Sequence, residues 1–503
     1  MRQRKARYRS RTMDETLELT KFRLSSTPNG LIYDVALSTD GILMSSTTTE
    51  RRNATKKCFV PYADIVGASI ERDSRSSTIA ISVFAYPKTK SILKKEDRRF
   101  REVKLYAKEE EGHDDHVTRA EAWKGQLMER VHGKSGVPQR KFLVFVNPAS
   151  GRGKAERIYR TFVAPMFARA EIETEVIITE YEGHARNSVE TREDIFDFDA
   201  IIIVSGDGLH HEIINGFMAR PDWSKAMKIP LGAIPGGSGN SLVCSLLHLA
   251  NEPFTPTCAA FACARGRSAP LDILSVHTPT ETRYSFLSVT WGIVANIDIK
   301  SEQFRWMGEA RFTAGFISEL LSLPKYRGKF YYLPVSQSEA LSKENSIESN
   351  SKPVSHLLPS FDEEPSEEKG WKVIDGEFVT LAASLLTHIG SDLFIAPSAH
   401  LAGGILYVFV IPATCSRLAV LKSFLKMEEG HHIHVPGTEL IGVRAMRLEP
   451  EVGGARRVPE IMSVDGERIA YGPMQVQVHR AVGRVLILKR EKLLTESDIG
   501  TPV

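Results

Sequence analysis

The sequence has few cysteines, no long apolar run and little net charge. Its 503 residues include five cysteines, which are scattered and form no CxxC pair. A disulfide framework or a zinc site is therefore not expected, and a reducing compartment such as the cytoplasm fits. The longest apolar runs, such as 201–204 and 405–412, are far shorter than the ~18 residues that a membrane-spanning helix needs.

The charge balance and the first residues exclude little more. A formal net charge of +3 is close to neutral for this length, so it indicates no nucleic acid partner. The chain starts with basic and polar residues and lacks the apolar segment of a secretory signal. Residues 1–25 are predicted to be a basic disordered tail, either simply solvated or in electrostatic contact with anionic lipid.

The rest of the chain falls into three patterned regions. Residues 26–137 hold short β-branched and aromatic runs that end in one helical pattern, which predicts an N-terminal β-rich accessory domain similar to a pleckstrin-homology-like fold. Residues 138–270 alternate apolar strands with helical patterns, which indicates an α/β domain with a parallel sheet. A β-rich domain is predicted at 271–490, with a disordered insert at 336–369 and a tail at 491–503.

Turn residues follow three strands of the predicted α/β domain, at 147–153, 205–208 and 235–240. Ligands of open α/β sheets bind at the carboxyl ends of the strands. Glycine lets backbone N–H groups approach a phosphate, and helix N-termini attract anions. One such glycine often makes only a tight turn, but three loops at one sheet edge predict a phosphate or nucleotide site. None of them matches the Walker or GxGxxG pattern.

Asp207 is the candidate reactive group. It lies between two glycines after the apolar strand 200–204. A carboxylate in this place can accept a hydroxyl proton during phosphoryl transfer or bind magnesium, and it can also simply cap the helix that begins near Leu209. The adjacent His210 and His211 would diverge by ~100° on a helix, so we interpret neither as a metal ligand.

Two runs resemble a known family. Residues 204–223 read VSGDGLHHEIINGFMARPDW and residues 230–246 read PLGAIPGGSGNSLVCSL. Both are similar to the catalytic domain of sphingosine and long-chain-base kinases, within the diacylglycerol-kinase-like superfamily. The likeness continues through FVNPASGRGKA (145–155), WGIVANIDIKSEQFRWMGEARFTAG (291–315) and SVDGERI (463–469). It covers residues 140–490 apart from the insert.

The resemblance implies a parallel-sheet nucleotide-binding domain followed by a β-sandwich-like lipid-binding domain. It implies that ATP, with Mg²⁺, phosphorylates the primary hydroxyl of a sphingoid base, that Asp207 acts as the general base, and that Ser288 and Asp298 hold the polar head. The implied nucleotide-binding residues are Asn147, Ser150, Gly151, Gly153, Thr179, Gly206, Gly208, Gly237, Ser238, Gly239, Asn240, Arg305, Arg311, Asp465 and Glu467. Asp465 and Glu467 are also the implied magnesium-side carboxylates.

The resemblance leaves several assignments open. Phe424, Met427 and His432 would line an acyl tunnel or belong to the ordinary core. DGE occurs twice in the chain, at 375–377 and at 465–467, and the string at 375–377 is predicted to be a hairpin turn. Ala149 and Glu182 stand where relatives often have basic residues, which reduces the positive charge around the nucleotide but does not change the implied reaction.

Two other functions remain open: a ceramide or diacylglycerol kinase of the same superfamily, and a non-catalytic scaffold that binds lipid or nucleotide. Ser205 stands where sister branches usually carry glycine, and Asp298 offers a carboxylate that attracts a cationic amine, so both favour the sphingoid base. The protein is expected to contact anionic membranes peripherally, through its first dozen residues or the basic stretch 88–104, unless that stretch is only a solvated hairpin.

Overall fold

The structure is a computed structural model, and it describes residues 20–23, 32–46, 57–72, 79–91, 94–107, 116–133, 139–302, 310–335, 355–453 and 459–488. The chain forms two compact units, Met1–Pro138 and Gln139–Val503. The second unit begins close to the predicted start of the α/β domain. No helix within the described ranges combines the length and the apolar content that crossing a membrane requires.

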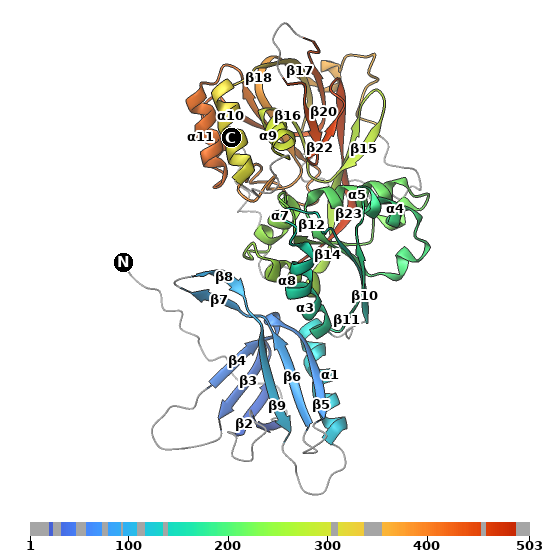
Figure 1. Cartoon of the computed structure of the whole chain (residues 1–503), viewed down its shortest axis with the longest axis vertical. Coiled ribbons are helices and arrows are strands. Elements are labelled where there is room, and N and C mark those ends of the chain that lie inside the picture. The colour runs from blue at the N-terminus through green and yellow to red at the C-terminus, as the bar shows by residue number, and fades with distance from the viewer. Residues whose placement is uncertain are drawn as a thin grey trace, which may run out of the picture. The chain divides into compact units, whose positions relative to one another are not determined.

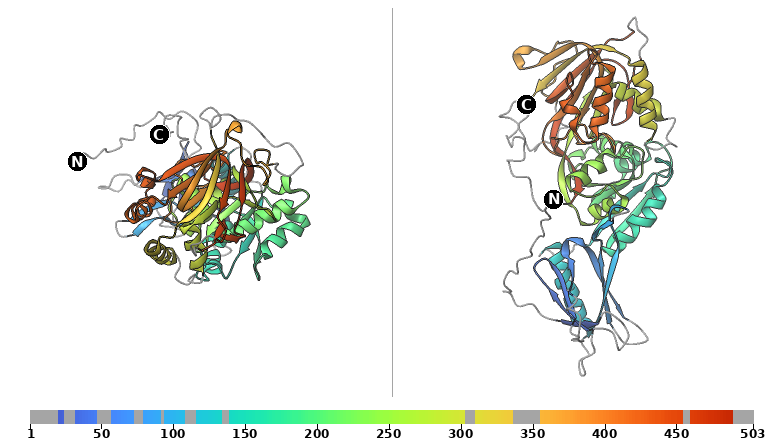
Figure 2. Two further views of the ribbon diagram at one scale, coloured as in Figure 1. Left: turned by 90° about the horizontal axis from the view of Figure 1, so that it is seen from above. Right: turned by 90° about the vertical axis from the view of Figure 1, so that its left-hand side faces the viewer.

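The first unit is a seven-stranded antiparallel sheet that packs against one helix (Figure 1). The strands, in the order β4-β3-β2-β1-β9-β6-β5, are β1 Thr20–Arg23, β2 Ile32–Leu37, β3 Gly41–Ser46, β4 Lys57–Pro61, β5 Ile65–Arg72, β6 Ile79–Ala85 and β9 Arg101–Ala107. A 3-10 turn, η1 (Tyr62–Asp64), joins β4 to β5. Helix α1 (His116–His132) buries Ala120, Trp123, Leu127 and Val131 in the core, as their helical spacing predicts. Figure 2 shows this helix against the sheet.

Two findings in this unit bear on the predictions, and the first corrects one of them. Strand β1 lies inside the stretch 1–25 that was predicted to be a disordered tail, and it pairs with β2 and β9. Residues 1–19 and 24–25 lie outside the described residues.

The basic stretch 88–104 contains the hairpin of β7 (Lys88–Ser91) and β8 (Lys94–Arg98). Arg98 in this hairpin is only 7% exposed, and its guanidinium lies 2.8 Å from Asp64 and 2.7 Å from the Tyr86 carbonyl. It is therefore a structural cation rather than part of a basic surface.

The described part of the second unit contains one 14-stranded mixed sheet. Four parallel strands begin it: β11 (Ile172–Ile178), β10 (Arg140–Val146), β12 (Ala200–Ser205) and β13 (Leu231–Pro235). The antiparallel part comprises β14 Arg267–His277, β15 Thr282–Ser285, β16 Ser288–Gly292, β17 Tyr326–Pro334, β18 Lys372–Ser384, β19 Leu406–Pro412, β20 Glu439–Pro450, β21 Met462–Val464, β22 Glu467–Ile469 and β23 Met474–Ile487. β23 pairs with β13, β14 and β20, so the last strand joins the α/β part to the β-rich part (Figure 1).

Helices connect and follow the parallel strands, as the sequence predicts. They are α2 Ala155–Ile158, η2 Tyr159–Val163, α3 Ala164–Arg169, α4 His184–Thr191, η3 Glu193–Asp197, α5 Asp207–Ala219, α6 Trp223–Ala226, α7 Ser241–Leu249 and α8 Pro256–Arg265. The β-rich part adds α9 Ile293–Ser301, α10 Ala310–Ser322, η5 Glu367–Lys369, α11 Arg417–Met427 and η6 His431–His434. Helix α8 was not predicted. Its start is legible in the sequence, because Thr255 caps the N–H of Cys258 at 3.1 Å and Pro256 follows.

Residues 355–369, which were predicted to belong to a disordered insert, pack on the sheet. Leu357 and Leu358 contact a buried cluster that includes Tyr331 and Trp371. The Arg447 guanidinium donates to the carbonyl oxygens of Ser360, Phe361 and Glu363 over 2.7–3.1 Å. A single arginine therefore compensates for the low apolar content of this segment. Residues 336–354 lie outside the described part of the chain.

Candidate active site

A cavity of about 1370 Å³ runs from the carboxyl ends of β10, β12 and β13 into the β-rich part of the second unit. Its polar end is lined by the three predicted loops, and its other end by α9, α10, α11 and residues 389–393. The predicted site residues on its wall are Asn147, Ser150, Gly151, Thr179, Gly206, Asp207, Gly208, Gly237, Ser238, Gly239, Ser288, Asp298, Phe424, Asp465 and Glu467. The loop–strand pattern thus identified the location of the cavity.

The glycines of the loops allow the loops to pack on one another. A Cβ on Gly237 would lie 2.4 Å from the Cα of Gly206, and a Cβ on Gly206 would lie 2.7 Å from the Gly239 carbonyl. A Cβ on Gly151 would lie 2.9 Å from the Gly236 carbonyl. Only glycine fits such contacts. The loops therefore present their backbone as one stacked surface, which suits close approach by a phosphate.

Two polar side chains stabilise this surface. The hydroxyl of Ser150 accepts the N–H of Gly206 at 3.1 Å. The side-chain amide of Asn240 accepts the N–H of Gly237 at 3.1 Å and donates to its carbonyl at 2.8 Å. Asn240 and Gly153 do not line the cavity; Gly153 instead takes φ +68 in its turn. These two predicted nucleotide-binding residues therefore stabilise the conformation of the loops and do not lie on the cavity wall.

Asp207 is the first residue of α5, and Gly206 is the N-cap. Its carboxylate accepts the backbone N–H groups of Ser241 and Leu242, at 2.7 and 3.1 Å, at the start of α7. Asp207 thus caps α7 rather than its own helix. Burial raises the pKa of Asp207, and the two N–H donors oppose that rise. A buried carboxylate with a raised pKa is a competent proton acceptor on the cavity wall.

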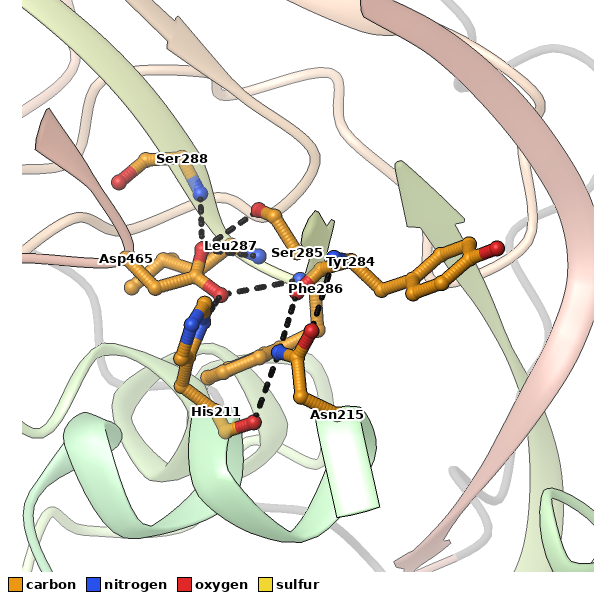
Figure 3. Close-up of polar contacts among 8 residues, drawn as sticks. All are labelled: His211, Asn215, Tyr284, Ser285, Phe286, Leu287, Ser288 and Asp465. Carbon is orange, nitrogen blue, oxygen red and sulfur yellow. Dashed lines mark hydrogen bonds and ion pairs between the residues drawn. The ribbon is translucent and has the colours of Figure 1, made fainter. Parts of the chain in front are cut away.

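Asp465 is saturated with donors (Figure 3). One carboxylate oxygen accepts the Ser285 hydroxyl at 2.6 Å and the N–H groups of Leu287 and Ser288 at 3.1 and 3.0 Å. The other accepts the N–H of Phe286 at 3.3 Å and lies 2.8 Å from His211 Nδ1. The side chain is 0% exposed. The prediction that Asp465 binds magnesium is therefore wrong in this structure, because both oxygens already serve protein donors.

Of the two DGE strings, the one at 465–467 forms a hairpin turn, and the one at 375–377 does not. Asp465 and Gly466, with φ +52 and +86, form the two-residue turn between β21 and β22, the geometry that favours Asp-Gly. Asp375 lies inside β18, opposite Lys329, and its carboxylate is 2.7 Å from Arg327. The predicted hairpin turn at 375–377 is thus a continuous strand.

The described residues contain no cluster of three or more His, Cys, Asp or Glu side chains that could hold a metal. With Asp465 occupied, the remaining predicted metal-side carboxylate is Glu467, whose Oε1 would lie 3.1 Å from a Cβ on Gly208. Mg²⁺ commonly keeps few protein ligands and is held largely by substrate phosphates. The residues present therefore fit a magnesium ion that arrives with the nucleotide, next to Glu467.

The apolar end of the cavity agrees with only part of the predicted lipid site. Phe424 lines it and stacks on Phe316 of α10, with ring centroids 4.2 Å apart. Met427 and His432 are buried away from it, and His432 Nε2 lies 2.9 Å from the Ile395 carbonyl. These two residues belong to the core, so their prediction as tunnel residues is wrong.

The predicted polar-head residues lie near the Asp465 turn. Ser288 begins β16 and is buried. Asp298 lies on α9, and its Oδ2 is 3.5 Å from the position of a Cβ on Gly466. Of the two predicted phosphate-contacting arginines, Arg305 lies outside the described residues, and only the backbone of Arg311, near the start of α10, is described.

His211, Asn215 and Ser285 were missed as site residues. His211 and Asn215 follow Asp207 at intervals of four, a spacing that places all three on one face of a helix. That signal was legible in the sequence. His210 is different: its Nδ1 lies 3.4 Å from the Gly206 carbonyl, and burial lowers its pKa to about 4.

Comparison with known proteins agrees with this geometry. Residues 141–276 match the family described as "Diacylglycerol kinase catalytic domain", and residues 287–487 match "YegS C-terminal NAD kinase beta sandwich-like domain". Together with the glycine-lined cavity, these matches define a kinase of the diacylglycerol-kinase-like superfamily.

Curated relatives narrow the class. The chain is 39% identical over 365 residues to sphingosine kinase 1 of Homo sapiens, covering 70% of this chain and 92% of that protein. It is 34% identical over 340 residues to sphingosine kinase 1 of Arabidopsis thaliana, covering 66% of this chain and 69% of that protein. It is 31% identical over 351 residues to sphingoid long chain base kinase 4 of Schizosaccharomyces pombe, covering 69% of this chain and 75% of that protein. The chain belongs to the sphingosine kinase family.

Proposed function

We propose that this protein transfers the γ-phosphoryl group of ATP to the primary hydroxyl of a sphingoid long-chain base, giving the 1-phosphate and ADP. One observation carries the proposal. A single cavity has stacked glycine loops at one end and apolar side chains such as Phe312, Phe316 and Phe424 at the other, with Asp207 and Asp298 on its wall. A nucleotide and an amphipathic alcohol can meet there.

Asp207 is the proposed proton acceptor. As the hydroxyl oxygen attacks the γ-phosphorus, its proton passes to the Asp207 carboxylate, and the bond to the β-phosphate oxygen breaks to release ADP. The N–H donors of Ser241 and Leu242 fix the orientation of the carboxylate. The backbone surface of the three loops holds the phosphates.

Magnesium is a proposed cofactor, with Glu467 as the carboxylate that would help to hold it beside the phosphates. When bound, Mg²⁺ neutralises charge on the transferring phosphoryl group. Asp465 takes no part in binding it. Asp465 instead stabilises the turn that precedes Glu467.

The proposed specificity depends on Asp298. A sphingoid base carries a protonated amine next to its primary hydroxyl, and a carboxylate on the cavity wall stabilises that charge. Ceramide, whose amine is acylated, and diacylglycerol offer no cation. A carboxylate at this position therefore favours the sphingoid base over both.

We further propose that the protein contacts membranes peripherally, on the cytoplasmic side, through α10 and α11. Ile317 and Leu321 on α10 are 54% and 74% exposed, and Leu418 and Leu425 on α11 are 60% and 70% exposed. The same two helices line the apolar end of the cavity. A lipid that partitions into a bilayer can thus reach the cavity beside an apolar surface that favours the membrane. Anionic lipid would add attraction for the basic residues of the first unit.

A lipid panel tests the proposal. The purified chain is incubated with γ-labelled ATP and, separately, with detergent-dispersed sphingosine, sphinganine, ceramide and diacylglycerol, and the labelled lipids are separated. Label in the two sphingoid bases alone is the expected result. Label in ceramide or diacylglycerol would reassign the substrate, and no label in any lipid at saturating ATP would contradict the kinase activity itself.

A further inference from the structure

Three of the polar side chains that helix α5 presents to the cavity lie at intervals of four residues. Asp207, His211 and Asn215 all line it, and residues four apart lie one above the other on a helix face. The proposed reaction uses only Asp207. The other two side chains reach across to the β-rich part of the unit, and their partners indicate what they do (Figure 3).

His211 is connected to Ser288 through Asp465. Because an ionised carboxylate only accepts, the 2.8 Å contact between His211 Nδ1 and Asp465 Oδ2 requires the hydrogen on Nδ1. Asp465 in turn accepts the N–H of Ser288 at 3.0 Å and donates its own N–H to the Ser288 carbonyl at 2.9 Å. Both backbone groups of Ser288 are therefore fixed relative to α5.

Asn215 fixes the strand that leads to Ser288. Its side-chain oxygen accepts the N–H of Tyr284 at 3.0 Å, and its nitrogen donates to the Tyr284 carbonyl at 2.8 Å. The same nitrogen donates to the His211 carbonyl at 2.9 Å. Tyr284 belongs to β15, so one amide pairs with the backbone of this strand as a neighbouring strand would.

We infer that His211 and Asn215 are positioning residues that set the separation between Asp207 and Ser288 across the cavity. The inference rests on the proposed function, in which Asp207 receives the proton and Ser288 lies at the polar head. α5 then acts as a rigid spacer: its first residue carries the base, and His211 and Asn215, about one and two turns later, hold the turn and strand that place the polar head of the lipid. Misplacement by about 1 Å can cost ~10²-fold in rate, because proton acceptor, hydroxyl and phosphorus must align.

The test compares four variants with the wild-type protein: Asn215→Ala, His211→Ala, His211→Asn and Ser285→Ala. His211→Asn keeps an N–H donor where Nδ1 lies, and Ser285→Ala removes one donor to Asp465 without touching α5. Asn187→Ala, on the exposed surface of α4, is the matched control. For each protein, kcat, the KM for ATP, the KM for sphingosine and the number of ATP molecules bound per chain are measured.

We expect kcat for Asn215→Ala and His211→Ala to fall by roughly 10–100-fold, with ATP stoichiometry and the KM for ATP within about twofold of wild type. His211→Asn should recover most of the rate, and Ser285→Ala should fall between. A loss of kcat that merely follows a loss of ATP-binding chains, or unchanged kcat in both alanine variants, would overturn the inference. If the wild-type protein itself phosphorylates no sphingosine, the proposed function is wrong. The wild-type assay therefore distinguishes a failure of the proposed function from a failure of this inference.

Discussion

At the scale of single residues, the site depends on carboxylates whose surroundings give them different tasks. Asp207 is buried and accepts two backbone N–H groups, Asp465 is buried and accepts five donors, and Asp298 lies half-buried on the cavity wall. Burial favours the neutral form of a carboxyl group, and N–H donors favour the ionised form. These surroundings support the proposed roles of Asp207 as proton acceptor, Asp465 as structural anchor and Asp298 as partner for an ammonium group.

The two DGE aspartates offer a matched pair. Asp465→Asn places an amide nitrogen against N–H donors in a fully buried site, whereas Asp375→Asn weakens an ion pair with Arg327 whose side chains are 51% and 45% exposed. We expect roughly 3–5 kcal/mol of lost stability for Asp465→Asn and about 1 kcal/mol or less for Asp375→Asn. Chemical denaturation followed by tryptophan fluorescence measures both. Equal losses would contradict the anchoring role of Asp465.

Asp298→Asn should act mainly on the lipid. Removing one partner of a desolvated charge pair costs on the order of 2–5 kcal/mol, so the KM for sphingosine should rise at least about tenfold while the KM for ATP stays nearly constant. Steady-state kinetics with each substrate varied in turn checks this. A parallel rise in both constants would indicate a folding defect rather than a lost ammonium partner.

At the scale of elements, buried histidines make the packing of helices and strands sensitive to acid. Burial lowers the pKa of His210 on α5, His388 after β18, His432 in η6 and His479 on β23 to about 4. The unfolded chain binds these protons near pH 6.5, whereas the folded chain does so near pH 4. Each histidine therefore contributes stability above pH 6.5 that is lost as the pH falls from 6.5 to 4.

His479→Gln isolates one of these contributions. Glutamine can keep a hydrogen bond to the Ser275 hydroxyl, which lies 2.8 Å from His479 Nε2, but it does not titrate. The Tm of the wild-type protein minus that of the variant should decrease steadily as the pH is lowered from 6.5 to 4. Ionisable groups that do not interact with His479, including Asp272, whose pKa burial raises to about 6, are common to both proteins and cancel. A constant difference would show that His479 keeps its ordinary pKa in the fold.

At the scale of the whole molecule, the exposed surface of α10 and α11 predicts how the protein meets a bilayer. Leu321→Glu together with Leu418→Glu should weaken sedimentation with liposomes at least about tenfold, because charged side chains oppose insertion. Activity on detergent-dispersed sphingosine should be unchanged, since neither residue lines the cavity. Val452→Glu, at a position 61% exposed outside these helices, is the control. Unchanged liposome binding in the double variant would rule this surface out.

The sequence predicted the layout of the second unit better than its long-range contacts. The strands β10, β12 and β13, their following helices and the three loops depend on local periodicity and on glycine, so they were legible. The saturation of Asp465 depends on Ser285 and His211, which are far away in the chain. The packing of residues 355–369 depends on Arg447 in the same way. No local pattern encodes such pairs.

The most direct measurement of the central claim is single-turnover phosphorylation of sphingosine by wild-type protein and Asp207→Asn, with ATP binding measured on the same samples. The account predicts a rate lower by about 10²–10⁴-fold at nearly unchanged ATP affinity. Stability should fall modestly, because asparagine satisfies the N–H groups of Ser241 and Leu242 less well than a carboxylate. Near-wild-type turnover in Asp207→Asn would contradict Asp207 as the base that accepts the hydroxyl proton.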